Sequence, residues 1–312
     1  LRRSIAQHYW DTYSVKLQEQ QIEVTVGASG AFLLSFLALF DPGDRVAIAE
    51  PGYPAYRNIL SALNIEPVAV PCGPASDFQP TPELLQQAAG ARPLDGVLLA
   101  SPANPTGAMI APEMFAALGA WCNQRGIPLI SDEIYHGITY GAAAQTALAF
   151  NPEAIVINSF SKYFSMTGWR LGWMVAPERL LRTVERLAQN FFISPPTLPQ
   201  IAAIAAFECH DELRGNVAVY ARNRKLLLRE LPKAGLTQFA PADGAFYLYA
   251  DISALSNDSE TFCRDMLACT GVAATPGIDF DLTRGQSYVR FSFAGSTETM
   301  AEAARRLQDW LA

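Results

Sequence analysis

Asn158–Arg170, which reads NSFSKYFSMTGWR, directly follows the apolar run Ala154–Ile157, and that run is typical of a buried strand. The segment contains Lys162, one of only four lysines in the chain. Small hydroxyl side chains flank this lysine, and Arg170 follows eight residues later. An amine in an anion-binding setting is what a Schiff base to a phosphorylated aldehyde requires. The alternative is a lysine that lies in solvent after a strand, and this segment alone does not separate the two.

The composition excludes several classes of protein. A chain of 312 residues is long enough for about two domains, and its 50% apolar content supplies a large core. The net charge of −7 argues against a general binder of nucleic acids or anionic membranes. Five cysteines without a C-x-x-C pair indicate neither a zinc ribbon nor a disulfide framework, so we expect a reducing, cytoplasmic location. The sequence shows no signal peptide and no apolar run of roughly 18 residues.

Apolar runs alternate with helical patterns from residue 22 onward. Continuous apolar strands separated by helices are typical of a mostly parallel sheet that is covered by helices on both faces. The sequence therefore predicts an α/β fold of this kind. The expected strands are 22–26, 45–49, 96–100, 128–131, 154–157 and 171–175, and the clearest expected helices are 31–40 and 113–125.

Polar side chains follow the predicted strands at the points where the strands end. In open α/β sheets, ligands bind in the crevice outside the carboxyl ends of the strands. Five separate loops are therefore expected to meet at one site, and this shared position carries more weight than any single motif. The five residues are Ser29, Tyr53, Asn104, Asp132 and Lys162.

Three of these loops have a functional and a structural interpretation. The stretch Gly27–Gly30 before a helix is suited to phosphate, because amides at a helix N-terminus bind anions, but it also fits a plain tight turn. Asn104 has an amide that suits a cofactor oxygen, or it caps a turn before a proline. Asp132 either caps a helix or holds a pyridinium nitrogen protonated, which lets a ring accept electrons.

One aromatic residue and two arginines also have both a functional and a structural interpretation when each is taken alone. Tyr53 stands between prolines on a predicted loop, where it either stacks on a flat ligand or packs in the core. Arg170 fits a surface ion pair. Arg290 lies in an alternating strand pattern, so it either binds a ligand or projects into solvent. The three histidines show no metal spacing, and no metal site is expected.

Taken in order, the motifs resemble those of the class I/II aminotransferases, which are pyridoxal-phosphate enzymes of fold type I. The resemblance covers nearly the whole chain. Each piece is weak alone, but the ordered set is very specific. The pieces are Thr25–Gly30, Ser101–Gly107, Ser131–Tyr135, Ser159–Arg170 and Val289–Arg290.

The resemblance assigns roles residue by residue. It implies that Lys162 forms the Schiff base with pyridoxal 5'-phosphate and then removes the substrate α-proton, so the catalytic residues are Lys162, Asp132 and Tyr135. It implies that Arg290, together with Asn104, binds the substrate α-carboxylate, and that two half-reactions follow each other in ping-pong order. The implied cofactor-binding residues are Ala28, Ser29, Gly30, Tyr53, Asn104, Asp132, Tyr135, Ser159, Ser161, Lys162 and Arg170.

The expected domain organisation also follows from the resemblance. A large cofactor-binding domain is expected over residues 15–190 and a smaller C-terminal α+β domain over 191–312. Residues 1–14 are expected to be the remnant of an N-terminal helix, because family members usually carry a further segment before it. That segment contributes to the substrate lid and to a contact with a partner subunit's phosphate. Family members are typically homodimers, and we expect the same here.

The function predicted from the sequence is transfer of an amino group from an L-amino acid to a 2-oxo acid. Two alternatives stay open at this point. One is a carbon–sulfur β-lyase on the same fold, because the cofactor residues do not decide what happens at the α-carbon. The other is a non-catalytic, aminotransferase-like regulatory domain. Arg290 predicts an α-carboxylate and says nothing about the substrate's side chain.

Overall fold

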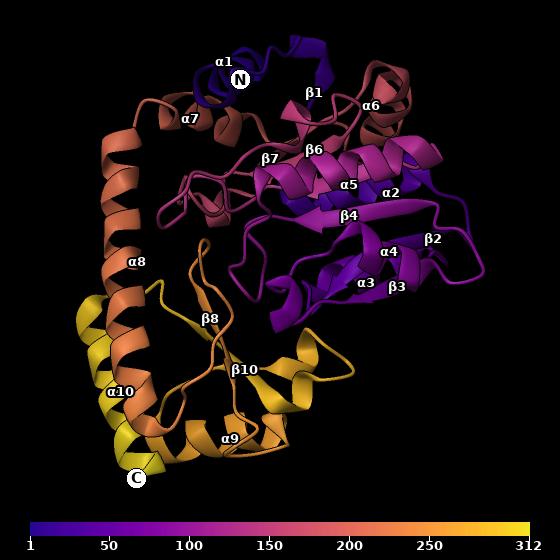
Figure 1. Cartoon of the computed structure of the whole chain (residues 1–312). Helices are drawn as coiled ribbons and strands as arrows, with labels where there is room; N and C mark the ends of the chain where they lie inside the picture. Colours follow the sequence, from indigo (N-terminus) through magenta and orange to yellow (C-terminus); the bar gives the residue numbers. More distant parts are fainter.

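The larger part of the protein is a seven-stranded sheet with helices on both faces. The computed structural model describes all residues, Leu1–Ala312 (Figure 1). The strand order is β1-β7-β6-β5-β4-β2-β3, and only β7 runs against its neighbours. The strands are β1 (Ile22–Thr25), β2 (Arg45–Glu50), β3 (Glu66–Pro71), β4 (Gly96–Ala100), β5 (Leu129–Asp132), β6 (Ile155–Ser159) and β7 (Gly172–Val175). The mostly parallel sheet predicted from the sequence is therefore present.

Side chains that alternate in direction along each strand fill the cores on both faces of this sheet. On β4, Val97 and Leu99 belong to one core cluster, whereas Leu98 between them belongs to the other. Successive side chains of a strand point to opposite faces, so a continuous apolar run feeds both cores at once. The helices that cover the two faces are α1 (Arg2–Tyr13), α4 (Pro82–Ala89), α5 (Pro112–Arg125) and α7 (Thr197–Ala206) on one, and α2 (Gly27–Leu39), α3 (Pro54–Ala62) and α6 (Glu178–Phe192) on the other.

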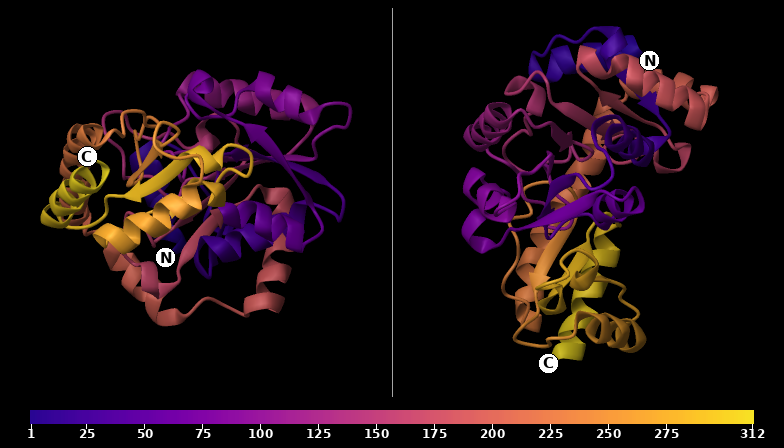
Figure 2. Two further views of the ribbon diagram at one scale, coloured as in Figure 1. Left: turned by 90° about the horizontal axis from the view of Figure 1, so that it is seen from below. Right: turned by 90° about the vertical axis from the view of Figure 1, so that its right-hand side faces the viewer.

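The C-terminal part has its own small sheet and its own core. Strand β10 pairs antiparallel with β8 on one side and with β9 on the other. Figure 2 shows this part lying at one end of the large sheet. Apolar residues from the strands and helices meet in a separate cluster that includes Leu248, Val289 and Leu307. The elements are β8 (Tyr247–Asp251), α9 (Ser259–Thr270), β9 (Thr275–Pro276), β10 (Tyr288–Ser292) and α10 (Thr297–Leu311).

Helix α8 (His210–Glu230) joins the two parts over 21 residues (Figure 1). Its Leu213 packs in the core of the large sheet, and its Leu227 packs in the core of the small sheet. The N-terminal helix α1 also packs on the large sheet, through Ile5 and Tyr9. The division of the chain at residue 190 stays a prediction, since helix α8 contributes to both cores.

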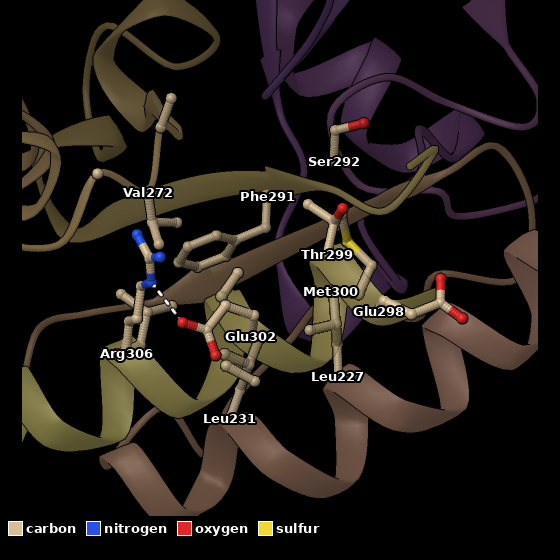
Figure 3. A pocket seen from close by; sticks show the side chains of 15 residues that line it. Leu227, Leu231, Val272, Phe291, Ser292, Glu298, Thr299, Met300, Glu302 and Arg306 are labelled. Carbon is tan, nitrogen blue, oxygen red and sulfur yellow. Dashed lines mark hydrogen bonds and ion pairs between the residues drawn. The ribbon is translucent and has the colours of Figure 1, made fainter. Parts of the chain in front are cut away.

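A cavity of about 520 Å³ lies in the C-terminal part, between α8, α10 and the end of β10 (Figure 3). Its walls are mostly apolar, with Leu227, Phe291 and Met300 among them. At its rim, Arg306 donates a hydrogen bond to Glu302 at 2.8 Å. No residue of this cavity carries one of the roles predicted from the sequence. None of the helices combines the length and the apolar character that crossing a bilayer requires.

Candidate active site

A second pocket, of about 330 Å³, lies at the carboxyl ends of the parallel strands. Loops after β1, β2, β4, β5 and β6 all contribute to it, as the positions of the polar residues predicted. Every residue assigned a role from the sequence lines this pocket except Gly30. The lining residues are Ala28, Ser29, Phe32, Tyr53, Tyr56, Asn104, Asp132, Ile134, Tyr135, Ser159, Ser161, Lys162, Thr167, Arg170, Tyr247 and Arg290.

Lys162 stands on the loop after β6, with its side chain half-buried in the pocket. Burial lowers the pKa of its amine, and the positive charges of Arg290 and Arg170 lower it further, while Asp132 acts in the opposite direction. Its Nζ lies 5.7 Å from the centre of the Tyr135 ring. An amine with a lowered pKa is uncharged more of the time, and the uncharged form is the nucleophile and the base.

Asp132 forms the floor of the pocket at the end of β5. Its carboxylate accepts hydrogen bonds from the Tyr56 hydroxyl and from the backbone N–H of Ile134, the latter at 3.0 Å. Burial raises the pKa of Asp132 to about 6, and both hydrogen bonds and the charge of Lys162 limit that rise. A carboxylate held in this way is suited to a cationic partner such as a protonated ring nitrogen.

Arg290 reaches the pocket from the small sheet. Its guanidinium donates to Asn104 Oδ1 at 2.8 Å and to Thr275 Oγ1 at 3.0 Å. The group lies over two aromatic rings, 4.3 Å from the centre of the Tyr247 ring and 4.7 Å from that of Phe280. Its Nε is buried without a partner. A planar guanidinium that is held by two hydrogen bonds and two rings and keeps a free donor is prepared to bind a carboxylate.

Tyr135 lies beside Lys162 and shares a 2.9 Å hydrogen bond with the hydroxyl of Tyr247. Burial raises the pKa of the Tyr135 phenol well above its usual value. Tyr135 therefore stays protonated at neutral pH and keeps a hydrogen to donate. Tyr53, by contrast, is 38% exposed at the mouth of the pocket, where it precedes α3 and meets Tyr56 edge to face.

Part of the pocket lining forms an anion-binding cradle. Helix α2 directs its N-terminus there, and Ser29, Ser159 and Thr167 place hydroxyls beside it. Arg170 lies directly over Gly27, where an added Cβ would come within 2.7 Å of its guanidinium. Backbone amides, hydroxyls and an arginine together form the kind of set that binds a phosphate group.

The local structure of Gly27–Gly30 differs from the predicted turn. Helix α2 begins at Gly27 itself, because this glycine takes a φ of +68° and completes the change of direction within one residue. Gly30 consequently lies inside the helix, where its Cα faces Val26 and the ring of Phe192. The structure therefore does not place Gly30 among the residues that line the pocket.

Sequence reasoning missed five of the lining residues. Tyr56 follows Tyr53 by three residues on a helix, and that spacing was the available signal for placing both on one face. Tyr247 comes from the small sheet, and no local pattern links it to the other loops. The remaining three are Phe32, Ile134 and Thr167.

The donor set fits a phosphorylated pyridine aldehyde. The pocket offers an amine for the aldehyde, a carboxylate for the ring nitrogen, donors for the ring oxygen and a cradle for the phosphate. The crowding of Arg170 against Gly27 is an independent observation, since a side chain at position 27 would fill the cradle. The same residues therefore have the chemistry to hold pyridoxal phosphate and, at Arg290, a substrate carboxylate.

Comparison with known proteins agrees with this chemistry. The family described as aminotransferase class I and II matches residues 1–307. The valine–pyruvate aminotransferase of Mycobacterium tuberculosis is 53% identical over 315 residues, which cover 100% of this chain and 81% of that protein. A (5-formylfuran-3-yl)methyl phosphate transaminase of Methanocaldococcus jannaschii is 33% identical, over 100% of this chain and 80% of its own length. The crystal structure of an aminotransferase from Mycobacterium tuberculosis superimposes with a TM-score of 0.97 at 53% identity, over 99% of this chain and 81% of that one.

Proposed function

The chain belongs to the class I and II aminotransferases, and on this premise we propose that its amino donor is a small apolar L-amino acid such as valine and its acceptor is pyruvate. The protein is a pyridoxal-phosphate-dependent transaminase that acts on amino acids and 2-oxo acids. The relatives named above are aminotransferases, and neither a β-lyase nor a regulatory domain is favoured.

The charges of the pocket support an apolar donor. Three cationic side chains line it, and each has a role with the shared part of any substrate or with the cofactor. Arg170 would hold the phosphate, Lys162 would react with the aldehyde, and Arg290 would bind the α-carboxylate. A donor with an uncharged side chain needs no further cation. The observation that carries the proposal is the 53% identity to a valine–pyruvate aminotransferase over the full chain.

In the proposed reaction, Arg290 and Asn104 orient the amino acid so that its α-carbon lies near Lys162. Pyridoxal phosphate, when bound, supplies an aldehyde that condenses with amines and a ring that takes up electrons from the α-carbon. The Lys162 amine accepts the α-proton in its uncharged form, and the lowered pKa of Lys162 increases the fraction of that form. Asp132 would accept a hydrogen bond from the protonated ring nitrogen, and Tyr135 would donate one to the ring oxygen. Tyr53 covers the mouth of the pocket.

The test is a donor comparison with the purified chain and added pyridoxal phosphate. With pyruvate as acceptor, L-valine should form alanine and the 2-oxo acid of valine, both of which chromatography measures. The same assay with L-aspartate should be at least about tenfold slower, because a second carboxylate would be desolvated without a cationic partner. Faster turnover of L-aspartate than of L-valine would exclude the proposed donor and leave the transaminase chemistry intact.

We further propose that the protein forms a homodimer. A patch of exposed apolar side chains lies at the end of α6 and along α7, and it includes Ile193, which is 86% exposed. Large apolar side chains that are exposed together on one segment are typical of an interaction site, and identical chains most often pair about a twofold axis. The other members of the patch are Phe191, Leu198, Ile201 and Ile204. Sedimentation should give a dimer for the native chain and a folded monomer for Ile201→Asp.

A further inference from the structure

Glu133 follows Asp132 but points to the other face of the sheet, as alternation at the end of β5 requires. Its side chain has no exposure to solvent. One carboxyl oxygen, Oε1, accepts three hydrogen bonds, from the Ser131 hydroxyl at 3.1 Å, the Thr146 hydroxyl at 3.1 Å and the Ala147 backbone N–H at 2.8 Å. Glu133 therefore joins the turn after β5 to the segment that precedes β6.

The second oxygen, Oε2, has no hydrogen-bond partner although it is fully buried. No lysine or arginine pairs with this carboxyl group. The one basic side chain within 4 Å is His136, whose Nδ1 lies 3.6 Å from Oε2, and this is beyond hydrogen-bond range. An ionised carboxylate here would leave a charged oxygen unpaired in the interior, and that arrangement is costly.

His136 is neutral, and this makes the ionised form of Glu133 still less favourable. His136 Nε2 lies 3.0 Å from the Ser101 carbonyl oxygen, which only accepts, so Nε2 carries the hydrogen. Burial lowers the pKa of His136 to about 3, so the ring is neutral and Nδ1 is an acceptor. It accepts from the Tyr13 hydroxyl at 2.7 Å. An ionised Oε2 would therefore find no N–H donor on His136.

We propose that Glu133 keeps a proton on Oε2 at neutral pH and is a positioning residue, which fixes the turn that carries Asp132 and Tyr135. In the neutral form, the partnerless Oε2 carries no charge, and Oε1 keeps its three donors. The turn is thereby held on the face opposite the pocket.

The titratable groups around Glu133 agree with this arrangement. Burial raises the pKa of Glu133 to about 8; its three hydrogen bonds act against this rise, and the negative charge of Asp132 adds to it. Tyr9 and Tyr13 of α1 lie near the carboxyl group, and burial raises the pKa of both phenols well above their usual value. The surroundings of Glu133 thus hold neutral groups and one anion, and no cation.

The functional consequence rests on the proposed roles of Asp132 and Tyr135, whereas the protonation of Glu133 does not. A neutral Glu133 leaves Asp132 as the only negative charge at the floor of the pocket. A second charge on the adjacent residue would raise the pKa of Asp132 and oppose its ionised form. Raising the pH through the pKa of Glu133 should therefore loosen the turn and weaken cofactor binding.

Infrared spectroscopy of the purified chain tests the protonation directly. A protonated carboxylic acid has a carbonyl stretch that a carboxylate lacks. At pH 7, we expect this band in the native chain, shifted when the glutamates carry ¹³C in the carboxyl group, and removed as the pH rises through about 8. The labelled native chain needs no mutation, so a folding defect cannot obscure the result. A band that does not shift on glutamate labelling would overturn the proposal.

Variants assign the band and test the positioning role. Glu133→Gln should remove it, and Glu153→Gln, at an exposed residue paired with Arg179, should not. At pH 7, the dissociation constant of pyridoxal phosphate for Glu133→Gln should stay within about twofold of the native value, since glutamine keeps the neutral shape and the acceptor. Glu133→Leu should raise it about tenfold or more, because three buried donors lose their acceptor.

The pH dependence of cofactor affinity separates positioning from a general structural role. The native chain should bind pyridoxal phosphate more weakly above pH 8, and Glu133→Gln should lose that dependence. The same alkaline weakening in both proteins would exclude the positioning role. If the native chain binds no pyridoxal phosphate at any pH, the functional assignment fails, and with it the positioning role, while the infrared result still decides the state of Glu133.

Discussion

Arg290 Nη1 donates a hydrogen bond to Asn104 Oδ1 at 2.8 Å, although 186 residues separate the two in sequence. Arg290 belongs to the small sheet and Asn104 to a loop at the edge of the large sheet. The carboxylate-binding group and the cofactor-binding loops therefore come from different parts of the molecule. Substrate recognition depends on the relative position of the two parts as well as on the local chemistry.

Replacing Arg290 with lysine should weaken substrate binding. Lysine cannot form the paired hydrogen bonds of a guanidinium, and it also loses the planar contacts with the rings of Tyr247 and Phe280. We expect kcat/KM to fall about 10- to 100-fold, mainly through KM. Steady-state kinetics with the amino donor measures this, and Arg182→Lys on the exposed face of α6 serves as the control. An unchanged KM would remove Arg290 from the substrate site.

Replacing Lys162 with alanine should abolish covalent attachment of the cofactor. Reduction with borohydride followed by mass spectrometry should find the cofactor on Lys162 in the native chain and nowhere in Lys162→Ala. Turnover should fall by on the order of 10³-fold or more, because one amine serves as both nucleophile and base. Lys225→Ala changes an exposed lysine on α8 and should alter neither result. Retained turnover in Lys162→Ala would contradict the mechanism.

Cofactor affinity should also fall at acid pH. Binding to a protonated ring nitrogen requires ionised Asp132, and burial raises the pKa of this residue to about 6. Below that pH, the dissociation constant of pyridoxal phosphate should rise by up to about tenfold per pH unit from this group. Titration of the cofactor phosphate contributes in the same range, so Asp132→Asn supplies the baseline to subtract.

Replacing Tyr56 with phenylalanine should change the pH dependence of cofactor binding through Asp132. The hydrogen bond from Tyr56 stabilises the ionised form of Asp132 and holds its pKa down. Removing it should shift the acid loss of cofactor affinity to higher pH. Fluorescence titration of pyridoxal phosphate binding across pH 5–8 measures the midpoint. A midpoint that stays in place, or moves to lower pH, would mean that Tyr56 does not act on Asp132.

The pKa of Asp132 also has a consequence for stability. Because burial raises this pKa from 3.8 to about 6, the folded chain binds more protons than the unfolded chain between these values. The contribution of Asp132 to stability is therefore fully present below pH 3.8 and is lost as the pH rises through 6. Urea unfolding of the native chain and of Asp132→Asn across this window should show the difference between the two decreasing with rising pH.

Gly27→Ala should damage the phosphate cradle. The new Cβ would lie 2.7 Å from the Arg170 guanidinium, and a φ of +68° costs alanine about 1–2 kcal/mol. We expect cofactor affinity to fall about tenfold or more, with a lower melting temperature. Gly168→Ala lies in the same region, but its Cβ meets no atom within 4 Å, so that variant should bind normally. Equal effects of the two changes would point to general destabilisation.

The parallel sheet and the meeting of its loops were predictable because both follow from local patterns. Apolar runs such as Ile155–Ile157 identify buried strands, and polar residues at their ends mark the ligand edge. The reversal of β7 was not predictable in this way, since a short apolar run carries no direction. The helical start at Gly27 escaped prediction because a glycine pair before a helix equally indicates a turn.

The parts of the site that depend on tertiary packing could not be predicted from local sequence patterns. Tyr247 reaches the pocket because β8 pairs with β10 in a register that places Tyr249 opposite Arg290. The hydrogen bond from Tyr56 to Asp132 depends on how α3 packs against the end of β5. The spacing of Tyr53 and Tyr56 indicates a shared helix face, but it does not identify Asp132 as the partner of Tyr56, and no local pattern indicates Tyr247. The resemblance to a known family, by contrast, implied the roles of Lys162 and Arg290 directly.

Helix α8 converts a small rotation at one end into a large displacement at the other. Its 21 residues extend over about 32 Å, and its first turns are fixed in one core while its later turns are fixed in the other. A tilt of about 10° at the first turn would displace the far end by about 5 Å. That displacement is larger than the 2.8 Å distance between Arg290 and Asn104. A small change of angle at one end of this helix would therefore break or restore this hydrogen bond and move Arg290 relative to a substrate carboxylate. Lys162, which stands on the large sheet, would not move with it.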